Sequence, residues 1–215
     1  MKQAVKIAVL GCGTVGAQVV RLLQERAADY QARCGASLEI IGICVHNLAA
    51  PRPDFISSDL LTDQAEPLID QADLVIELIG GIEPARTYIT RALEAGKSVV
   101  TGNKALLAQH GPELFDLSRE READLYYEAA VAGAIPVVYG LRESLAGDRV
   151  QVVQGIVNGT TNYMLDQMEK KGWSFEQALT TAQELGYAEA DPTADIDGLD
   201  AAAKCALLAQ LAFHT

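Results

Sequence analysis

The sequence predicts an α/β fold with a doubly wound parallel sheet, followed by a smaller α+β region. Three observations predict it. Short β-rich runs alternate with amphipathic helical stretches up to about Gly147, a glycine-rich turn joins the first run to the first helix, and the pattern changes after Ala146-Gly147-Asp148. We therefore expect a dinucleotide-binding region over residues 1–146 and a second region over residues 147–215.

The predicted strands of the sheet are apolar runs that each end at a glycine, an asparagine or a polar residue. They are Val5–Leu10, Leu38–Val45, Leu74–Leu78, Ser98–Thr101 and Leu125–Glu128. Apolar residues at helical spacing predict helices between them, over Val15–Arg26, Pro84–Ala95 and Glu113–Arg121. The stretch from Asn47 to Asp63 contains two prolines and two serines, which predicts a surface loop.

The second region begins with a predicted strand over Val150–Val157, and the polar run 158–162 follows it. Ser174 and Gln177 have the spacing of a capping box before the helical Ala178–Leu185, and Gly186 is placed to end that helix. A last helix is predicted from Gly198 to Thr215.

Composition excludes several function classes. The chain has 215 residues, of which 49% are hydrophobic, and 17 Lys+Arg against 29 Asp+Glu give a net charge of −12 with no basic cluster, so we expect no nucleic-acid partner. No apolar stretch approaches the ~20 residues of a membrane helix, and the N-terminus lacks a signal-peptide pattern. We expect a cytoplasmic protein with no membrane partner, in which the four cysteines are reduced.

The glycine-rich turn Gly11-Cys12-Gly13-Thr14-Val15-Gly16 has the pattern G-x-G-x-x-G. It stands directly between a predicted strand and a predicted helix, as in the Rossmann fold. The three glycines allow a tight turn, close approach of the backbone to a pyrophosphate, and tight helix packing. The alternative is a glycine-rich turn that binds no ligand. The predicted cofactor-binding residues here are Gly11, Gly13, Thr14, Val15 and Gly16.

The end of the second strand bears on the choice between NAD and NADP. An NAD site usually has an acid there, which binds the 2′-hydroxyl of the ribose. This chain has Val45-His46-Asn47 instead. The missing acid favours NADP, and use of both cofactors is the next alternative. His46 or the more distant Arg52 is placed to contact a 2′-phosphate.

Two lysines are candidates for chemistry. Lys104 follows the fourth predicted strand and is placed to hold a substrate carboxylate or the nicotinamide amide; the alternative is a solubilising surface lysine. Asp200 and Lys204 lie four residues apart, hence on one helix face, in an acidic stretch that begins at Tyr187. A lysine among apolar neighbours can donate or accept a proton with a carboxylate orienting it, whereas a solvated ion pair would contribute little.

Several motifs together resemble the homoserine dehydrogenases. They are the glycine turn, Gly102-Asn103-Lys104-Ala105, the stretch from Asn158 to Tyr163, and the stretch from Tyr187 to Lys204, in this order over essentially the whole chain. The resemblance implies an oxidoreductase that uses NADPH or NADH for the reversible reduction of L-aspartate 4-semialdehyde to L-homoserine, a step shared by threonine and methionine biosynthesis. It also implies a homodimer. A non-catalytic NAD(P)-binding fragment or regulatory module is the alternative.

The resemblance implies roles for particular residues. Lys204 would protonate the carbonyl oxygen of the substrate, Asp200 would position Lys204, and Lys104 would face substrate and nicotinamide. Glu189 would bind the substrate amino group. The remaining members of the implied site are Tyr187, Thr161 and Asp195 around the substrate and His46 and Gly186 near the cofactor.

The stretch from Glu128 to Pro136 resembles the family segment whose backbone carbonyls hold a monovalent cation, usually sodium. The implied ligands are Glu128, Val131, Gly133 and Ile135. The alternative is an irregular turn fixed by Gly133 and Pro136. Family chains continue beyond the lysine-bearing helix, so we expect the second region of this chain to be incomplete.

Overall fold

The computed structural model describes residues 4–213. The chain forms two compact units, Met1–Ala130 and Val131–Thr215, and each is described here by itself. The division comes earlier than the boundary expected after residue 146, because residues 131–146 pack with the second unit rather than with the sheet.

The first unit is built on a six-stranded parallel sheet with the strand order β3-β2-β1-β4-β5-β6. The order reverses between β1 and β4, which is the switch point where a doubly wound sheet binds its ligands. The five predicted strands are confirmed to within three residues at each end, and β3 is an addition. The strands are β1 Ala4–Leu10, β2 Ser37–Cys44, β3 Leu61–Thr62, β4 Leu74–Glu77, β5 Ser98–Thr101 and β6 Leu125–Tyr126.

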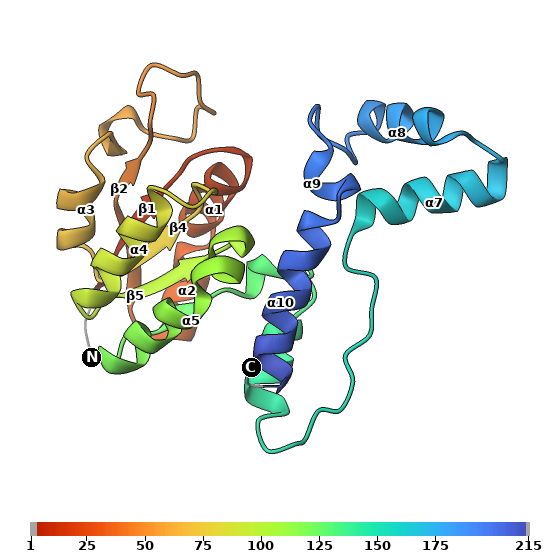
Figure 1. The fold of residues 1–215 in the computed structure, drawn as a ribbon. Helices are drawn as coiled ribbons and strands as arrows, with labels where there is room; N and C mark the ends of the chain where they lie inside the picture. The colour runs from red at the N-terminus through yellow and green to blue at the C-terminus, as the bar shows by residue number, and fades with distance from the viewer. Residues whose placement is uncertain (1–3, 214–215) are drawn as a thin grey trace. The chain divides into compact units, whose positions relative to one another are not determined.

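Helices cover both faces of this sheet (Figure 1). The predicted helices at α1 and α4 are confirmed, whereas α5 begins at Lys104, well before the predicted start at Glu113, and contains Pro112. Two further helices, α2 and α3, were not predicted. The bounds are α1 Thr14–Glu25, α2 Ala27–Cys34, α3 Ala65–Gln71, α4 Ala85–Glu94 and α5 Lys104–Glu120, with short 3₁₀ turns η1 at Ser58–Leu60 and η2 at Glu128–Ala130.

The core of the first unit forms where α1 packs against the middle of the sheet. Ile7 and Val9 of β1, Ile43 of β2 and Val20 of α1 are all completely buried. Each such side chain contributes about 1.5–3 kcal/mol when it is removed from water. This core fixes the ends of β1 and β2 beside the N-terminus of α1.

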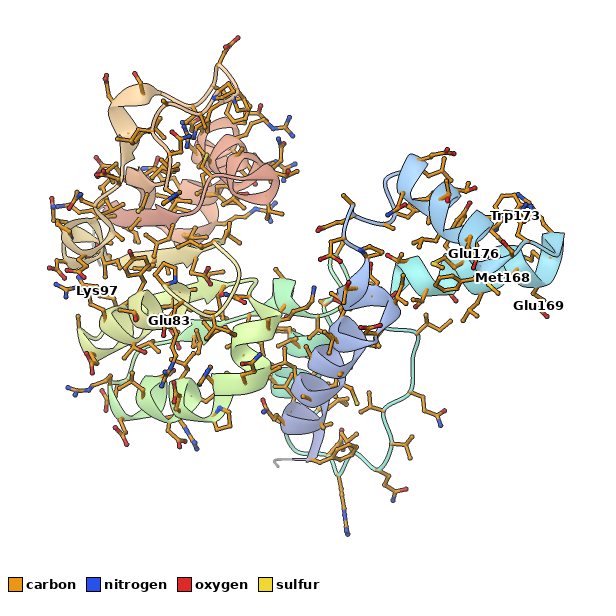
Figure 2. All side chains as sticks on the ribbon, turned by 45° about the horizontal axis from the view of Figure 1, so that its top comes forward. Glu83, Lys97, Met168, Glu169, Trp173 and Glu176 are labelled. Atoms are coloured by element: carbon orange, nitrogen blue, oxygen red, sulfur yellow. The ribbon has the colours of Figure 1, made fainter. Side chains whose placement is uncertain are left out.

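The regular elements of the second unit are all helices over its described residues. Helices α7 and α8 form a hairpin that encloses Met164, Ala178 and Ala182, and Met168 and Trp173 lie where the two helices join (Figures 1 and 2). The predicted capping box of Ser174 and Gln177 is confirmed at the start of α8. The bounds are α6 Val137–Tyr139, a π-turn η3 Gly140–Ser144, α7 Gly159–Lys171, α8 Phe175–Glu184, α9 Thr193–Ile196 and α10 Leu199–Phe213.

One predicted element of the second unit is wrong. Residues 150–157 are irregular and form no strand, and Val152 and Ile156 are 65% and 78% exposed. A strand needs a neighbour to pair its backbone N–H and C=O groups, and residues 131–213 contain no other strand. The last predicted helix is confirmed as α10 up to Phe213, and its expected continuation to Thr215 lies outside the described residues. Among residues 4–213, no helix is long and apolar enough to cross a membrane.

Candidate functional site

The glycine turn after β1 is shaped by close backbone contacts. Gly11 has φ 100°, and its N–H donates to the carbonyl oxygen of Cys44 at 2.9 Å. A Cβ at Gly11 would lie 2.6 Å from the carbonyl oxygen of Leu78, and a Cβ at Gly16 would collide with the carbonyl oxygen of Gly11. The first and third glycines are therefore required by the packing of the turn itself.

Gly13 differs from them because no protein atom lies within 4 Å of the position of a Cβ there. It is the N-cap residue of α1, no side chain caps the helix, and the first turn contains no acid. The N–H groups at this end of the helix thus carry partial positive charge that no side chain neutralises. Thr14 and Val15 are exposed beside it. An open, uncapped helix start of this kind fits the pyrophosphate of a dinucleotide.

The loops after β4 and β5 are joined by a buried carboxylate, that of Glu77. Its Oε1 accepts hydrogen bonds from the N–H groups of Ile79 at 2.7 Å and Gly80 at 3.3 Å, and its Oε2 accepts one from the hydroxyl of Thr101 at 2.6 Å. Glu77 and Thr101 are both 0% exposed. Sequence reasoning noted Glu77 only as a strand end, because one acid after an apolar run carries no signal of its burial.

Asn103 completes this connection. Its Nδ2 donates to the carbonyl oxygen of Gly81 at 2.7 Å, and its Oδ1 caps α5 by accepting from the N–H of Leu106 at 3.2 Å. Lys104, predicted as a site residue, is the first residue of α5 and is half-buried at the carboxyl end of β5. The loops that follow β4 and β5 are consequently held together on the same edge of the sheet as the glycine turn.

The chain after β2 positions His46 and Arg52 differently. His46 is exposed directly after the buried Val45. The terminal nitrogens of Arg52 donate to the carbonyl oxygens of Asn47 at 2.7 Å, Ala50 at 2.9 Å and Leu48 at 3.3 Å. Arg52 therefore holds the loop in shape, and of the two residues predicted to reach a 2′-phosphate, His46 is the exposed one.

In the second unit, the predicted pair Asp200 and Lys204 forms an ion pair on α10. Lys204 Nζ lies 2.6 Å from Asp200 Oδ2 and also donates to the carbonyl oxygen of Val157 at 2.7 Å. The Asp200 side chain is 7% exposed and the Lys204 side chain 19%, so water screens this pair far less than a surface pair. Both side chains line a cavity of about 390 Å³, together with Tyr163 and Tyr187, whose ring centroids lie 5.0 Å apart with the ring planes tilted by 59°.

Asn158 lines the same cavity and was not predicted as a site residue. Its Nδ2 donates to Asp195 Oδ1 at 2.7 Å and to Asp200 Oδ2 at 2.9 Å. An uncharged amide in a polar run gives no titratable or metal-binding signal, and no helix was predicted to begin after it. The structure thus brings Asp195, Asp200 and Lys204 together through a residue that sequence reasoning missed.

The other predicted residues of the second unit lie around this cavity to different degrees. The predicted Thr161 hydrogen-bonds Asn158 Oδ1 and is not among the lining residues, whereas its neighbour Thr160, which was not predicted, lines the cavity and donates its hydroxyl to the carbonyl oxygen of Tyr187 at 2.7 Å. Glu189 is exposed and also lies outside the lining. Gly186 has φ 75° and ends α8 as predicted.

The predicted cation-binding stretch crosses the boundary between the two units. Glu128 belongs to η2 in the first unit, and Val131, Gly133 and Ile135 belong to the second. Ala132 and Gly133 both have positive φ, 61° and 57°. Within residues 4–213 there is no cluster of three His, Cys, Asp or Glu side chains that could hold a metal ion.

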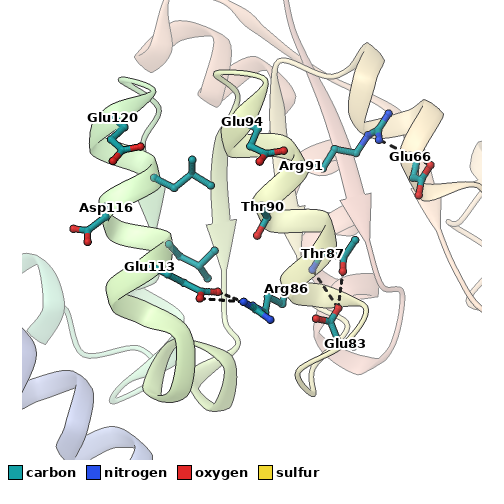
Figure 3. A pocket seen from close by; sticks show the side chains of 12 residues that line it. Glu66, Glu83, Arg86, Thr87, Thr90, Arg91, Glu94, Glu113, Asp116 and Glu120 are labelled. Atoms are coloured by element: carbon teal, nitrogen blue, oxygen red, sulfur yellow. Dashed lines mark hydrogen bonds and ion pairs between the residues drawn. The ribbon is translucent and has the colours of Figure 1, made fainter.

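A larger cavity of about 770 Å³ lies between α4 and α5 (Figure 3). Two ion pairs join four of its charged side chains, Arg86 with Glu113 and Arg91 with Glu66. Arg86 donates to both carboxylate oxygens of Glu113, at 2.6 and 3.0 Å, and this hydrogen bonding lowers the pKa of Glu113 below its usual value. No predicted site residue lines this cavity.

Comparison with known families finds a match for each of the two regions of the chain. Residues 11–128 match the family model described as the homoserine dehydrogenase NAD-binding domain, and residues 136–215 match the one described as homoserine dehydrogenase. A homoserine dehydrogenase of Corynebacterium glutamicum is 54% identical over 214 residues, which are 99% of this chain and 48% of that protein. The chain spans about half the length of the curated relatives it matches.

Solved structures give the same result. A crystal structure of a homoserine dehydrogenase from Thiobacillus denitrificans matches with a TM-score of 0.91 and 41% identity, covering 98% of this chain and 49% of that one. A hyperthermophilic archaeal homoserine dehydrogenase in complex with NADPH matches with a TM-score of 0.85 and 26% identity, covering 99% of this chain and 70% of that one. On this evidence, the chain belongs to the homoserine dehydrogenase family.

Proposed function

We propose that this chain carries the cofactor-binding region and part of the catalytic region of an NAD(P)-dependent oxidoreductase, which interconverts L-aspartate 4-semialdehyde and L-homoserine. The observation that carries the proposal is the largely buried pair of Asp200 and Lys204 at the wall of a cavity. Reduction of an aldehyde needs a proton at the carbonyl oxygen as a hydride reaches the carbon, and a lysine held by a carboxylate is suited to deliver that proton.

Lys204 donates the proton and Asp200 orients it. In the reduction, negative charge develops on the carbonyl oxygen, and the ammonium group stabilises that charge before it transfers a proton. In the reverse direction, the neutral amine removes the hydroxyl proton of homoserine. The nicotinamide, when bound, supplies or accepts the hydride. The hydrogen bonds to Asp200 and to the Val157 carbonyl hold Nζ in one position for this transfer.

The cofactor is held by the glycine turn, through Gly11, Gly13, Thr14, Val15 and Gly16. NADP is the favoured cofactor, because the exposed residue after β2 is His46 rather than an acid that would repel a 2′-phosphate. Gly186 completes the cofactor contacts. Lys104, at the start of α5, faces substrate and nicotinamide.

The substrate is an amino acid, so its ammonium group requires a carboxylate, and Glu189 supplies it. Tyr187, Thr161 and Asp195 complete the substrate site. Backbone carbonyls at Glu128, Val131, Gly133 and Ile135 suit a hard monovalent ion such as sodium, and we assign no step of the reaction to that ion. The protein acts in the cytoplasm, as a homodimer, in threonine and methionine biosynthesis.

The absorbance of NADPH and of NADH tests the proposal in the natural full-length protein. Aspartate 4-semialdehyde should cause oxidation of the reduced cofactor, and homoserine should cause reduction of the oxidised one. No turnover in either direction with either cofactor would reject the proposal. Cofactor binding measured by calorimetry in the same samples then separates a non-catalytic binding module from a protein that binds no dinucleotide.

A further inference from the structure

Asn158 uses every hydrogen-bonding group of its side chain. Its Nδ2 donates one hydrogen to Asp195 at 2.7 Å and one to Asp200 at 2.9 Å. Its Oδ1 accepts from the N–H of Thr161 at 2.9 Å and from the hydroxyl of the same residue at 2.7 Å. The side chain is buried, with 8% exposure. An asparagine amide can make two donor and two acceptor contacts, and all of them are made here.

The orientation of this amide is determined by its partners. The N–H of Thr161 can only donate, so the atom that faces it must be the oxygen, and the NH₂ group must face the two carboxylates. Ionised carboxylates only accept hydrogen bonds, which requires the same orientation from the other side. No other side chain of similar size offers two donors in one direction and an acceptor in the opposite one.

The contacts of Asn158 join three separate segments of the second unit. Asn158 is the N-cap of α7, Asp195 lies on α9, and Asp200 lies in the first turn of α10. The preceding residue, Val157, accepts a hydrogen bond from Lys204 Nζ. Residues 157–158 therefore hold both members of the ion pair. The Val157 carbonyl accepts from the Lys204 ammonium group, and the Asn158 amide donates to the Asp200 carboxylate.

The amide also balances charge in the cavity wall. Asp195 and Asp200 both lie within hydrogen-bond reach of a single nitrogen atom, and two ionised carboxylates at that separation repel each other. With Asn158 donating to both, Asp200 keeps one oxygen directed at Lys204. Without these two hydrogens, the repulsion between the carboxylates would be uncompensated, and Asp200 would no longer hold Lys204 in this orientation.

We propose that Asn158 is a positioning residue for catalysis, which sets the geometry of the Asp200–Lys204 pair by donating to the carboxylates. The proposal rests on the proposed dehydrogenase function. It is distinct from the role of Asn158 in capping α7, because the cap uses the amide oxygen and the positioning uses the amide nitrogen.

Two substitutions separate these roles. Asn158→Asp keeps an oxygen to cap α7 but replaces the donor nitrogen by a carboxyl oxygen. Asn158→Ser keeps a capping hydroxyl and removes both amide hydrogens that point at the carboxylates. Ser174→Asp is the matched control, since it puts the same acidic cap at the start of α8, where Ser174 hydrogen-bonds Gln177. All three should retain helix caps and fold, which circular dichroism and thermal unfolding verify.

We expect kcat to fall about 10- to 100-fold in both Asn158 variants of the natural full-length protein, as for other residues that orient a reacting group. The loss in Asn158→Asp should grow as the pH rises, because the new carboxyl group has one hydrogen to donate only while it is protonated. Ser174→Asp should keep the kcat and the pH profile of the parent. A kcat of Asn158→Asp within twofold of the parent at every pH would overturn the proposal.

A second measurement tests the positioning role of Asn158 without relying on catalysis. If the parent protein turned over neither substrate, the proposed function would be rejected, but this measurement would still test the positioning role. The NMR signal of the Lys204 ammonium group, assigned by its loss in Lys204→Arg, reports how well hydrogen bonds protect that group from exchange with water. The signal should persist in the parent and in Ser174→Asp and disappear in both Asn158 variants. Its persistence in Asn158→Ser would contradict the positioning role.

Discussion

The carboxylate of Glu77 accepts a hydrogen bond of 2.6 Å from the hydroxyl of Thr101, and both side chains are completely buried. Because the two residues are the last of β4 and β5, their bond joins two neighbouring strands at the edge of the sheet where the glycine turn lies. Burial of a carboxylate is unfavourable unless hydrogen bonds compensate it, and Glu77 accepts three.

Glu77→Ala should lower the free energy of unfolding by about 1–3 kcal/mol, because it leaves the N–H groups of Ile79 and Gly80 and the Thr101 hydroxyl without their acceptor. Glu77→Gln should cost less, since its amide oxygen still accepts from the N–H groups. Urea unfolding measures both. The exposed Glu39 is the control, and Glu39→Gln should change stability by less than about 0.5 kcal/mol. Equal stability of Glu77→Ala and the parent would contradict the anchoring role.

Gly13→Ala should weaken dinucleotide binding about tenfold or more and leave the fold intact. The added methyl group meets no protein atom within 4 Å, yet it occupies the space that the pyrophosphate needs at the start of α1. Calorimetry with NADPH measures the affinity. Gly147→Ala, which also meets nothing within 4 Å, should bind like the parent. Unchanged affinity in Gly13→Ala would place the dinucleotide elsewhere.

His46→Asp should shift cofactor preference toward NADH. A carboxylate after β2 repels a 2′-phosphate and can accept a hydrogen bond from a 2′-hydroxyl, so the ratio of kcat/KM for NADPH to that for NADH should fall about tenfold or more. Gln18→Glu adds the same charge on an exposed position of α1 and should leave the ratio unchanged. An unaltered ratio in His46→Asp would show that this residue does not contact the ribose.

Asp70→Asn should reduce the dependence of stability on acidic pH. The hydrogen bond from Arg91 is the main cause that holds the pKa of Asp70 below its usual value. A lowered folded-state pKa contributes stability that is present above the ordinary carboxyl pKa of about 3.9 and is lost as the pH falls through the lower folded-state value. The parent should therefore lose more stability than Asp70→Asn between about pH 5 and pH 2 in thermal unfolding. Parallel curves would contradict this assignment.

The sheet and the glycine turn could be predicted from sequence because apolar runs and glycines are local signals. The start of α5 could not, since Gly111 and Pro112 resemble a helix boundary, although the helix continues through both. The short strand β3 was not predicted, because it lies within the stretch from Asn47 to Asp63, whose prolines and serines indicate a loop. Val150–Val157 was predicted as a strand from its apolar residues alone. It forms no strand because no neighbouring strand pairs with it, and the local sequence pattern does not reveal whether such a neighbour exists.

The ion pair on α10 could be predicted because residues four apart share a helix face. Its surroundings could not. Asn158 lies 42 positions before Asp200 in the sequence, and a contact at that separation exists only after the second unit has folded. The burial of Glu77 is likewise a product of packing between β4 and β5. Charged side chains at helical spacing are visible in sequence, whereas the neutral groups that orient them are not.

The single-turnover rate of hydride transfer in Lys204→Ala, with NADPH bound beforehand and aspartate 4-semialdehyde added, tests the account most directly. The rate should fall by orders of magnitude while calorimetry gives an unchanged NADPH affinity, because Lys204 acts on the carbonyl oxygen and not on the dinucleotide. Lys170→Ala removes an exposed lysine from a pair of the same spacing with Asp166 and should keep the parent rate. A Lys204→Ala rate equal to that of the parent would contradict the proposed role of Lys204.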